Sequence, residues 1–419
     1  MNRKCKKIAL ITPSLAKGGL ERVVVETAQG LEKWYDVTVI VMDTFRTDYP
    51  YAGRCLDLEI SWEDRRIAVR FYNFLKSIVS LRKLQKKEQF DLMIAHGELT
   101  SFPAILSAMS ACVPVVHENR LNALKDLQGR ATNFLLRLFF KRGSVKKIVT
   151  VSEGIGKSLQ CGLEIAPSKF KTIYNPFDME TIRSAAQKIP EGYEGIFMPS
   201  AKVLITVGRL THPKAQWYLL RIFAELKQKE ETARLLILGI GEMKEELLEL
   251  CRALNLSAFD GIEEQVPGDT YDVYFLGFQE NPYAFIRQSD LFVMTSLWEG
   301  FGNTIVEAMV SGTPVISTSC PSGPREIICP DLPEEAIVAK PNEEGSGVLM
   351  PTFENRFVGE DEPLSNVEKV WADTIYELLH DEKKREIFSK KGLKRAEDFR
   401  RESIVGEWKE MIELVLNVE

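Results

Sequence analysis

The segment DLFVMTSLWEGFGNTIVEAMVSGTPVIS, residues 290–317, carries three patterns in succession. A short apolar run leads into a glycine-punctuated loop, helical spacing follows up to Gly312, and a second apolar run closes the segment. Continuous apolar runs bounded by Gly or Pro predict buried strands, and a helix between two such strands is the unit of a parallel sheet. The segment therefore predicts an α/β fold whose ligand groups follow the carboxyl ends of strands.

The same alternation of buried strand and helix extends over the whole chain in two series. The apolar runs before residue 200 include 7–13, 36–43, 91–97 and 113–119, and those after it include 201–210, 234–241 and 290–296. Two such series predict two Rossmann-like, doubly wound domains. The strand rhythm stops where Pro and Gly gather at about 178–200. We expect domains over 1–185 and 186–398, with a terminal helix at 399–419 that could pack on the first domain, and solvated loops at about 257–271 and 331–347.

The composition of the chain is that of a soluble protein with more than one core. It has 419 residues, of which 45% are apolar and 27% charged. The apolar run Ile8–Ile11 is too short for a secretory signal, and no stretch reaches the ~18 apolar residues of a membrane span. The seven cysteines form no Cys-x-x-Cys pair. This pattern argues against a disulfide framework or zinc site and favours the cytosol.

Charge is divided unevenly between the two halves. Residues 1–180 contain 28 Lys and Arg against 19 Asp and Glu, a surplus of 9 positive charges. The remainder carries 54 − 28 = 26 bases and 60 − 19 = 41 acids, a surplus of 15 negative charges. A basic half predicts contact with an anionic partner such as nucleic acid or lipid.

Two carboxylates flank the glycine-rich loop of the opening segment. Glu299 follows the predicted strand, and Glu307 lies about one turn beyond the start of the predicted helix among mostly apolar neighbours. A carboxylate accepts two hydroxyl hydrogen bonds side by side and therefore suits a sugar or ribose diol. Favourable interaction with the helix dipole and ordinary capping are the structural alternatives.

Cations and glycines occur at other predicted strand ends. Arg209 ends the strand at 201–207, and Lys214 stands near the next helix start, which together suit a diphosphate; solvated surface bases are the alternative. Gly18 and Gly19 precede a helix, where a phosphate cradle and a simple turn fit equally well. The lone G-x-G in ILGIGEMKEEL (237–247) lacks the third glycine of a dinucleotide motif and predicts a turn.

These motifs together resemble a known family. EGFGNTIVEAM (299–309) resembles the E-x7-E signature of retaining GT-B glycosyltransferases of family 4, and VGRLTHPK (207–214) resembles their G-R-L-x4-K element. The likeness includes TVSEGIGKSL, IYNPFD, CPSGPREII and GVLMP and extends over nearly the whole chain. It implies two domains facing a central cleft that binds a nucleotide-sugar mainly on the C-terminal domain.

The resemblance also implies roles for individual residues. Arg209 and Lys214 would hold the diphosphate, and Glu307 would bind the ribose hydroxyls. Glu299 and the amides of the loop would hold the sugar. The loop 276–282 would lie against the base, and Gly18 and Gly19 would close over the phosphates. The loop residues concerned are Phe301, Gly302, Asn303 and Thr304.

The reaction implied is sugar transfer with retention at the anomeric carbon, without a metal or other cofactor. Arg209, Lys214 and a helix N-terminus would stabilise the leaving diphosphate, and no Asp-x-Asp pair suggests a metal. The family often places a histidine beside the transferred sugar. Two histidines follow first-domain strands, and we favour His117 over His96 for this position.

A basic, apolar helix suggests the acceptor. Residues 65–87 space Ile67, Phe71, Phe74, Leu75, Ile78, Leu81 and Leu84 along one helical face flanked by bases, and 134–147 repeats the theme. Such a helix can lie on an anionic membrane, although packing in a core is commoner. We expect a cytoplasmic enzyme, on the membrane face when bound, that extends a glycan or lipid-linked acceptor in polysaccharide, capsule, lipopolysaccharide or glycolipid assembly.

Three rival functions weigh against this interpretation. A sugar-nucleotide epimerase of the same fold would bind the same nucleotide but needs more acid and base residues. A nucleic-acid binder fits the basic half alone and lacks a recognised motif. An NAD oxidoreductase fails on the missing fingerprint. The sequence leaves open the nucleotide (UDP by family expectation, with GDP open), the sugar, the acceptor, the linkage and the oligomeric state.

Overall fold

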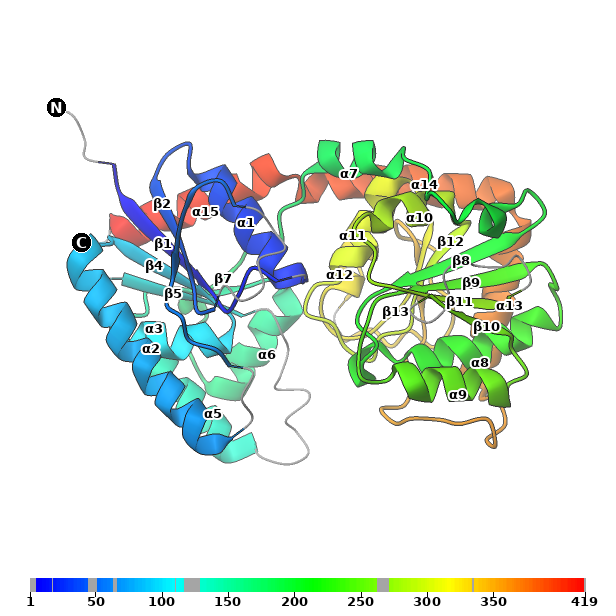
Figure 1. Ribbon diagram of the computed structural model, residues 1–419, viewed down its shortest axis with the longest axis horizontal. Coiled ribbons are helices and arrows are strands. Elements are labelled where there is room, and N and C mark those ends of the chain that lie inside the picture. The colour runs from blue at the N-terminus through cyan, green and yellow to red at the C-terminus, as the bar shows by residue number, and fades with distance from the viewer. Residues whose placement is uncertain are drawn as a thin grey trace. The chain divides into compact units, whose positions relative to one another are not determined.

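The structure is a computed structural model. It describes residues 5–16, 18–43, 51–62, 66–109, 111–116, 129–261, 271–333 and 335–417. The chain forms two compact units, each described below by itself: Met1–Asp178 with Phe399–Glu419, and Met179–Asp398 (Figure 1). Both units are α/β, as the sequence predicted.

The first unit is built on a seven-stranded parallel sheet in the order β3-β2-β1-β4-β5-β6-β7. Its strands are β1 (Lys7–Thr12), β2 (Asp36–Val41), β3 (Arg54–Asp57), β4 (Leu92–His96), β5 (Ala111–Val116), β6 (Ile148–Thr150) and β7 (Phe170–Thr172). Its helices are α1 (Gly19–Leu31), α2 (Ile67–Glu88), α3 (Glu98–Ser107), α5 (Gly129–Phe140), α6 (Glu153–Leu163) and α15 (Arg401–Leu416). The central strands are almost wholly buried because helices cover both faces of the sheet.

Right-handed crossovers divide the helices of the first unit between the two faces. The chain moves from β1 to β2 in one direction and from β3 through β4, β5, β6 and β7 in the other, which puts α1 opposite α2, α3, α5 and α6 (Figure 1). Helix α15 packs on α1. Arg401 at its start forms ion pairs with Glu26 at 2.8 Å and Asp178 at 3.1 Å. The terminal helix therefore belongs to the first unit.

The second unit repeats the architecture with a parallel sheet in the order β10-β11-β9-β8-β12-β13-β14. Its strands are β8 (Lys202–Val207), β9 (Ala233–Leu238), β10 (Ala258–Asp260), β11 (Val273–Gly277), β12 (Leu291–Met294), β13 (Val315–Thr318) and β14 (Val348–Met350). Its helices are α7 (Met179–Ala186), α8 (Gln216–Lys227), α9 (Lys244–Ala253), α10 (Pro282–Gln288), α11 (Asn303–Ser311), α12 (Pro324–Ile328), α13 (Asn366–His380) and α14 (Glu382–Ala396). Helix α8 packs on α9 and α13 over one face, and α11 packs on α7, α10 and α14 over the other.

Two expectations from the sequence need correction. The boundary falls after Asp178 and not after residue 185, because α7 packs on α10 and α11 and the Ala185 carbonyl accepts a hydrogen bond from Asn281 Nδ2 at 2.8 Å. The range 257–271 is not all loop, because 258–260 forms edge strand β10; residues 262–270 of that range lie outside the described parts. Residues 331–347 contain neither helix nor strand among those described, as expected.

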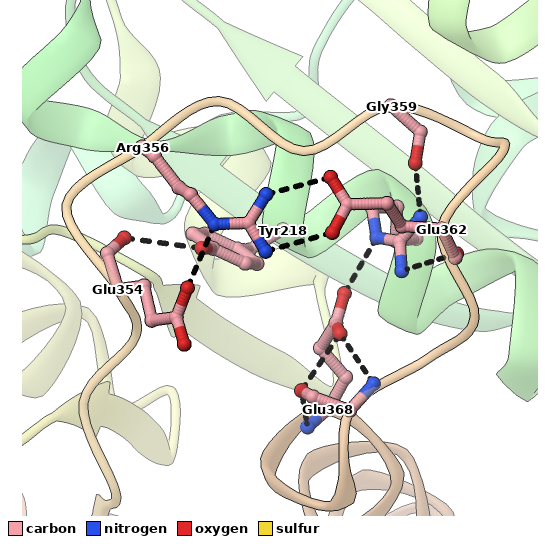
Figure 2. A network of polar contacts seen from close by, with 8 residues as sticks. Tyr218, Glu354, Arg356, Gly359, Glu362 and Glu368 are labelled. Atoms are coloured by element: carbon pink, nitrogen blue, oxygen red, sulfur yellow. Dashed lines mark hydrogen bonds and ion pairs between the residues drawn. The ribbon is translucent and has the colours of Figure 1, made fainter.

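A network of polar contacts holds the segment between β14 and α13 to the second unit (Figure 2). Arg221 of α8 forms an ion pair with Glu368 at 2.6 Å, and the side chains of both residues are 2% exposed. The Arg221 guanidinium also donates to the Gly359 and Glu362 carbonyls. The Glu368 carboxylate accepts from the amide and hydroxyl of Ser365, which closes the capping box of α13. The Arg221 guanidinium and both carboxylate oxygens of Glu368 therefore have hydrogen-bond partners.

Glu368→Ala is expected to lower the free energy of unfolding by about 3–5 kcal/mol, because it leaves the buried Arg221 guanidinium without its counter-charge. The measurement is urea unfolding followed by fluorescence of Trp217 and Trp371, which are fully buried in this unit. Glu362→Ala is the matched control, since its carboxylate pairs with an exposed Arg356 and should change the unfolding free energy far less. Equal effects of the two changes would contradict the assignment.

Candidate active site

The sheet of the second unit changes winding direction between two adjacent strands. The chain leaves β8 through α8 toward β9 on one side, whereas it leaves β12 through α11 toward β13 on the other side. At such a switch point the two following loops diverge and open a crevice at the carboxyl ends of the strands. The candidate residues 209–214 follow β8, and 299–307 follow β12. The fold therefore brings the two motifs to the same switch point at the carboxyl edge of one sheet.

Lys214 and Glu299 meet directly across this switch point. The Nζ atom of Lys214 lies 2.5 Å from Oε1 of Glu299, and their side chains are 23% and 9% exposed. Such a largely buried pair is stable only when further hydrogen bonds satisfy its remaining atoms. Ser296 Oγ supplies one by donating to the same Oε1 atom at 2.6 Å. Burial, with Glu299 nearby, raises the pKa of the neighbouring Cys320 thiol to about 12.

Hydrogen bonds to backbone carbonyls tie three strand ends together beneath this pair. Thr295 Oγ1 donates to the carbonyls of Lys214 at 3.3 Å and Ala215 at 3.2 Å. The Leu297 amide donates to the Pro213 carbonyl at 2.8 Å, and Thr318 Oγ1 donates to the Ser296 carbonyl at 2.6 Å. The loop after β8, the residues after β12 and the end of β13 are therefore held together by hydrogen bonds.

The loop after β8 is held from its other side by the G-x-G turn. A Cβ atom on Gly239 would lie 1.9 Å from the Gly208 carbonyl oxygen, and one on Gly241 would lie 2.1 Å from the Leu210 carbonyl oxygen. Two backbones can approach this closely only without side chains. The two glycines of the G-x-G sequence are therefore explained by this close approach of two backbone segments, without a dinucleotide motif. The turn holds the backbone beside Arg209, whose side chain is exposed.

Gln216 adds a second support for Arg209. Its Nε2 atom donates to the Arg209 carbonyl at 3.0 Å, although Gln216 is only 2% exposed. The preceding Ala215 adopts a left-handed conformation with φ 49°, which a residue other than glycine rarely takes. The loop is therefore held in a specific, locally strained shape immediately before α8.

The glycine-rich loop after β12 is shaped by contacts with the segment after β13. Gly302 caps α11 with φ 98°, a conformation that favours glycine. The Phe301 side chain is 3% exposed, so it anchors the loop in the core. A Cβ atom on Gly323 would lie 1.6 Å from the Phe301 carbonyl oxygen. Asn303 and Thr304 form the first turn of α11, and the amides at a helix N-terminus attract anions.

Glu307 lies on α11, one turn after the helix start, and is 8% exposed. The loop 276–282 begins at the end of β11, on the same edge of the sheet. Lys214 and Glu299 are thus in contact, whereas Arg209 and Glu307 are placed on adjoining loops and helices of the same edge. Among the described residues, no group of three or more His, Cys, Asp or Glu side chains could hold a metal ion.

The first unit has its own switch point, between β1 and β4. Gly18 and Gly19 follow β1 and begin α1, with Gly18 in an extended conformation. His96 ends β4, is fully buried, and its ring centroid lies 6.2 Å from that of Trp408 on α15. His117, which we favoured over His96, lies outside the described residues. His96 therefore lies in the core of this unit. The preference for His117 over His96 as the residue beside the transferred sugar stays a prediction.

Sequence reasoning missed three residues that shape the site. Ser296 holds Glu299, Gln216 holds Arg209, and Gly323 accommodates Phe301. Ser296 stands three residues before Glu299 at the end of an apolar strand, which is a usable signal for a polar support. Gly323 gives no such signal, because its partner is 22 residues away in the chain.

Two family models and a known relative match this chain. The family model described as Glycosyltransferase Family 4 matches residues 17–181, and the model described as Glycosyl transferases group 1 matches residues 201–346. An uncharacterised glycosyltransferase of Methanocaldococcus jannaschii is 32% identical over 82% of this chain and 84% of its own length. The two models thus match parts of both units.

Two further matches bear on the ligands that related proteins bind. N-acetylgalactosamine-N,N'-diacetylbacillosaminyl-diphospho-undecaprenol 4-alpha-N-acetylgalactosaminyltransferase of Campylobacter jejuni is 28% identical over 78% of this chain and 84% of its own length. The crystal structure of Anabaena HepE in complex with UDP-glucose matches with a TM-score of 0.71 at 16% identity and covers 97% of this chain and 99% of HepE. At that identity the structural match shows the GT-B fold alone.

Gly323→Ala is expected to displace the Phe301 carbonyl and to lower the free energy of unfolding by about 1–3 kcal/mol through overpacking. The measurement is thermal unfolding of the whole chain. Gly359→Ala in the same unit is the control, since a Cβ atom there meets nothing within 4 Å. A Gly323→Ala variant as stable as this control would show that the loop contact is not needed.

Proposed function

Because this chain belongs to the family 4 glycosyltransferases, we propose that it transfers a hexose or N-acetylhexosamine from a UDP-sugar to a glycan or lipid-linked acceptor in the assembly of a cell-surface polysaccharide or glycolipid. The single observation that carries the proposal is the meeting of Lys214 and Glu299 at a switch point of a parallel sheet. A cation for phosphate and a carboxylate for hydroxyls stand there side by side.

The donor's diphosphate is assigned to Arg209 and Lys214. Arg209 is exposed on a loop whose backbone is fixed, and Lys214 extends from the same loop. The first amides of α11 add positive potential for phosphate oxygens. In this proposal all three groups surround the diphosphate before its bond to the sugar breaks, which is the condition for stabilising its growing charge without reorganisation.

The hydroxyls of the donor are assigned to the two carboxylates. Glu299 takes the sugar hydroxyls, with the loop amides of 301–304 beside it, and Glu307 takes the ribose hydroxyls. Ser296 keeps Glu299 in a single orientation, because its hydroxyl donates to Oε1 and leaves Oε2 for another donor. A carboxylate held in this way loses less rotamer entropy when a ligand binds.

The reaction is proposed to retain the anomeric configuration, because the E-x7-E pattern resembles that of retaining enzymes. The acceptor hydroxyl attacks the anomeric carbon from the face on which the diphosphate leaves. A new carbon–oxygen bond to the acceptor forms, the bond to the diphosphate oxygen breaks, and the hydroxyl proton passes to that leaving oxygen. We expect no metal to be required, since Arg209 and Lys214 supply the positive charge. His117 is proposed to contact the transferred sugar.

A lipid-linked acceptor is supported by the name of the Campylobacter relative, whose substrate is a diphospho-undecaprenol glycan. Within the described parts of this chain, every helix falls short of the length or the hydropathy that a membrane span needs. An acceptor anchored in lipid therefore calls for contact between the enzyme and the membrane surface.

The donor can be identified by adding a panel of nucleotides and nucleotide-sugars and measuring the melting temperature, followed by assays of sugar transfer and release. A UDP-sugar is expected to raise the melting temperature most. Interconversion of the donor sugar without an acceptor would instead indicate an epimerase. No response to any nucleotide would contradict the proposed function.

Glu307→Ala is expected to weaken nucleotide binding about 10- to 100-fold, because a charged acceptor of two hydroxyl hydrogen bonds is lost. Arg209→Ala is expected to lower the turnover rate about 100- to 1000-fold, in line with the loss of a group that stabilises developing charge. Calorimetric titration with UDP and initial rates measure the two effects. Glu362→Ala, an exposed carboxylate of the same unit, serves as the control. Parent-like behaviour of both variants would refute the site assignment.

A further inference from the structure

Helix α2 changes chemical character along its length. The sequence predicted one apolar stripe, and the structure divides it: Leu81 is 1% exposed, whereas Ile67 is 86%, Phe71 62% and Leu75 45% exposed. Tyr72 and Val79 are exposed as well. One side of the second half of the helix is therefore buried against the unit, whereas the exposed apolar side chains gather mainly on its first half.

The second half of α2 presents positive charge on its outer surface. The helix carries six bases, Arg70, Lys76, Arg82, Lys83, Lys86 and Lys87, against one acid, Glu88, for a net charge of 6 − 1 = +5. Glu88 is buried and pairs with Arg54 at 2.8 Å. Arg82, Lys83, Lys86 and Lys87 are exposed, and no contact with an acid is found for them within the described part of the chain. An apolar segment thus leads into a cationic one along a single helix.

The neighbouring helices on this face of the sheet also carry exposed apolar side chains and exposed bases. Helix α2 packs on α3, and Phe102 of α3 contacts Phe139 of α5 with ring centroids 4.8 Å apart. The exposed apolar side chains on these two helices are Leu99, Phe134 and Leu138. Lys141 and Arg142 follow α5 and are exposed. Figure 1 shows α2 and α5 on the same side of this sheet.

The direction of α2 sets which edge of the sheet carries the apolar segment. Helices that connect parallel strands run opposite to them, so the start of α2 lies toward the carboxyl edge. Gly18 and Gly19 follow β1 at that edge. The exposed apolar segment is thus on the edge of the first unit where a ligand of this fold binds, and the bases Arg82 to Lys87 extend from it along the outer surface.

We propose that this α2–α3–α5 surface docks on an anionic lipid bilayer, with the first half of α2 entering the interface and its basic half lying on the headgroups. The proposal rests on the proposed function, for which it names the place of the lipid-linked acceptor. Exposed aromatic and aliphatic side chains favour the headgroup boundary, and cations attract anionic lipid. A purely polar partner would leave Ile67 and Phe71 unburied. In a dimer of this chain, the two α2 helices would each carry a charge of +5 and would repel one another.

The experiment is co-sedimentation of the whole protein with vesicles of phosphatidylcholine alone or with phosphatidylglycerol added. Binding is expected only to the anionic vesicles and should weaken strongly in 0.5 M salt, where the screening length is about 4 Å. Lys83→Gln/Lys86→Gln/Lys87→Gln is expected to bind roughly 100-fold more weakly. Lys383→Gln/Lys390→Gln/Lys394→Gln on α14, which removes the same charge from exposed positions, should bind like the parent.

A second pair of variants tests the apolar segment. Phe71→Ser/Leu75→Ser is expected to weaken vesicle binding about 10-fold or more, since two exposed apolar side chains no longer enter the interface. Ile387→Ser/Leu414→Ser, at 53% and 52% exposed positions elsewhere, should leave binding unchanged. The proposal would be overturned if the test and control variants lost vesicle binding equally. It would also be overturned if the parent bound neutral and anionic vesicles equally well. So would a concentration-dependent dimer in sedimentation that Phe71→Ser/Leu75→Ser dissociates.

The UDP-induced change in melting temperature, measured on the same variants, separates this proposal from the proposed function. A preserved UDP response without vesicle binding would refute the docking surface alone. Vesicle binding by a parent that responds to no nucleotide would refute the proposed function and leave the surface standing. Preference for soluble polyglutamate over anionic vesicles would show that the basic segment serves an acidic polypeptide, and would also refute docking on lipid.

Discussion

The ion pair between Lys214 and Glu299 is the interaction on which the geometry of the second unit's site depends. It joins the loops that follow two adjacent strands of opposite winding, and the backbone hydrogen bond from the Leu297 amide to the Pro213 carbonyl links the same two loops. Both groups are largely withdrawn from water, so their charges are compensated only while the strand ends stay in register. The hydroxyls of Ser296, Thr295 and Thr318 secure that register. A small displacement of either loop would separate the charges.

Close backbone approach is the second constraint, and it requires glycine at positions that support the site loops. Gly239 and Gly241 let one turn lie against the loop that carries Arg209, and Gly323 does the same for the loop that carries Glu299. Both site loops therefore lie against a backbone that leaves no room for a side chain. Rigid support of this kind is what a site needs to hold charged groups in advance of binding.

The two units use one architecture for different chemistry. The second unit gathers a cation and carboxylates at its switch point, whereas the first unit presents a long helix whose surface passes from apolar to basic. The charge surplus of the N-terminal half is thus concentrated in part on α2, where it is exposed and not consumed by ion pairs within the described part of the chain. A soluble donor and a lipid-anchored acceptor would call for this division of surfaces.

Local patterns in the sequence determined the α/β class, the two strand series and the candidate residues Arg209, Lys214, Glu299 and Glu307, because strand burial and glycine-rich turns are properties of neighbouring residues. The edge strand β3 escaped detection, since RCLD carries no apolar run, and the unit boundary moved because α7 finds its partners about a hundred residues later. Only the tertiary structure decided that Lys214 pairs with Glu299, that Gly323 lies on Phe301, and that the start of α2 stays exposed. Those facts depend on contacts between segments distant in the chain, and residue periodicity carries no information about them.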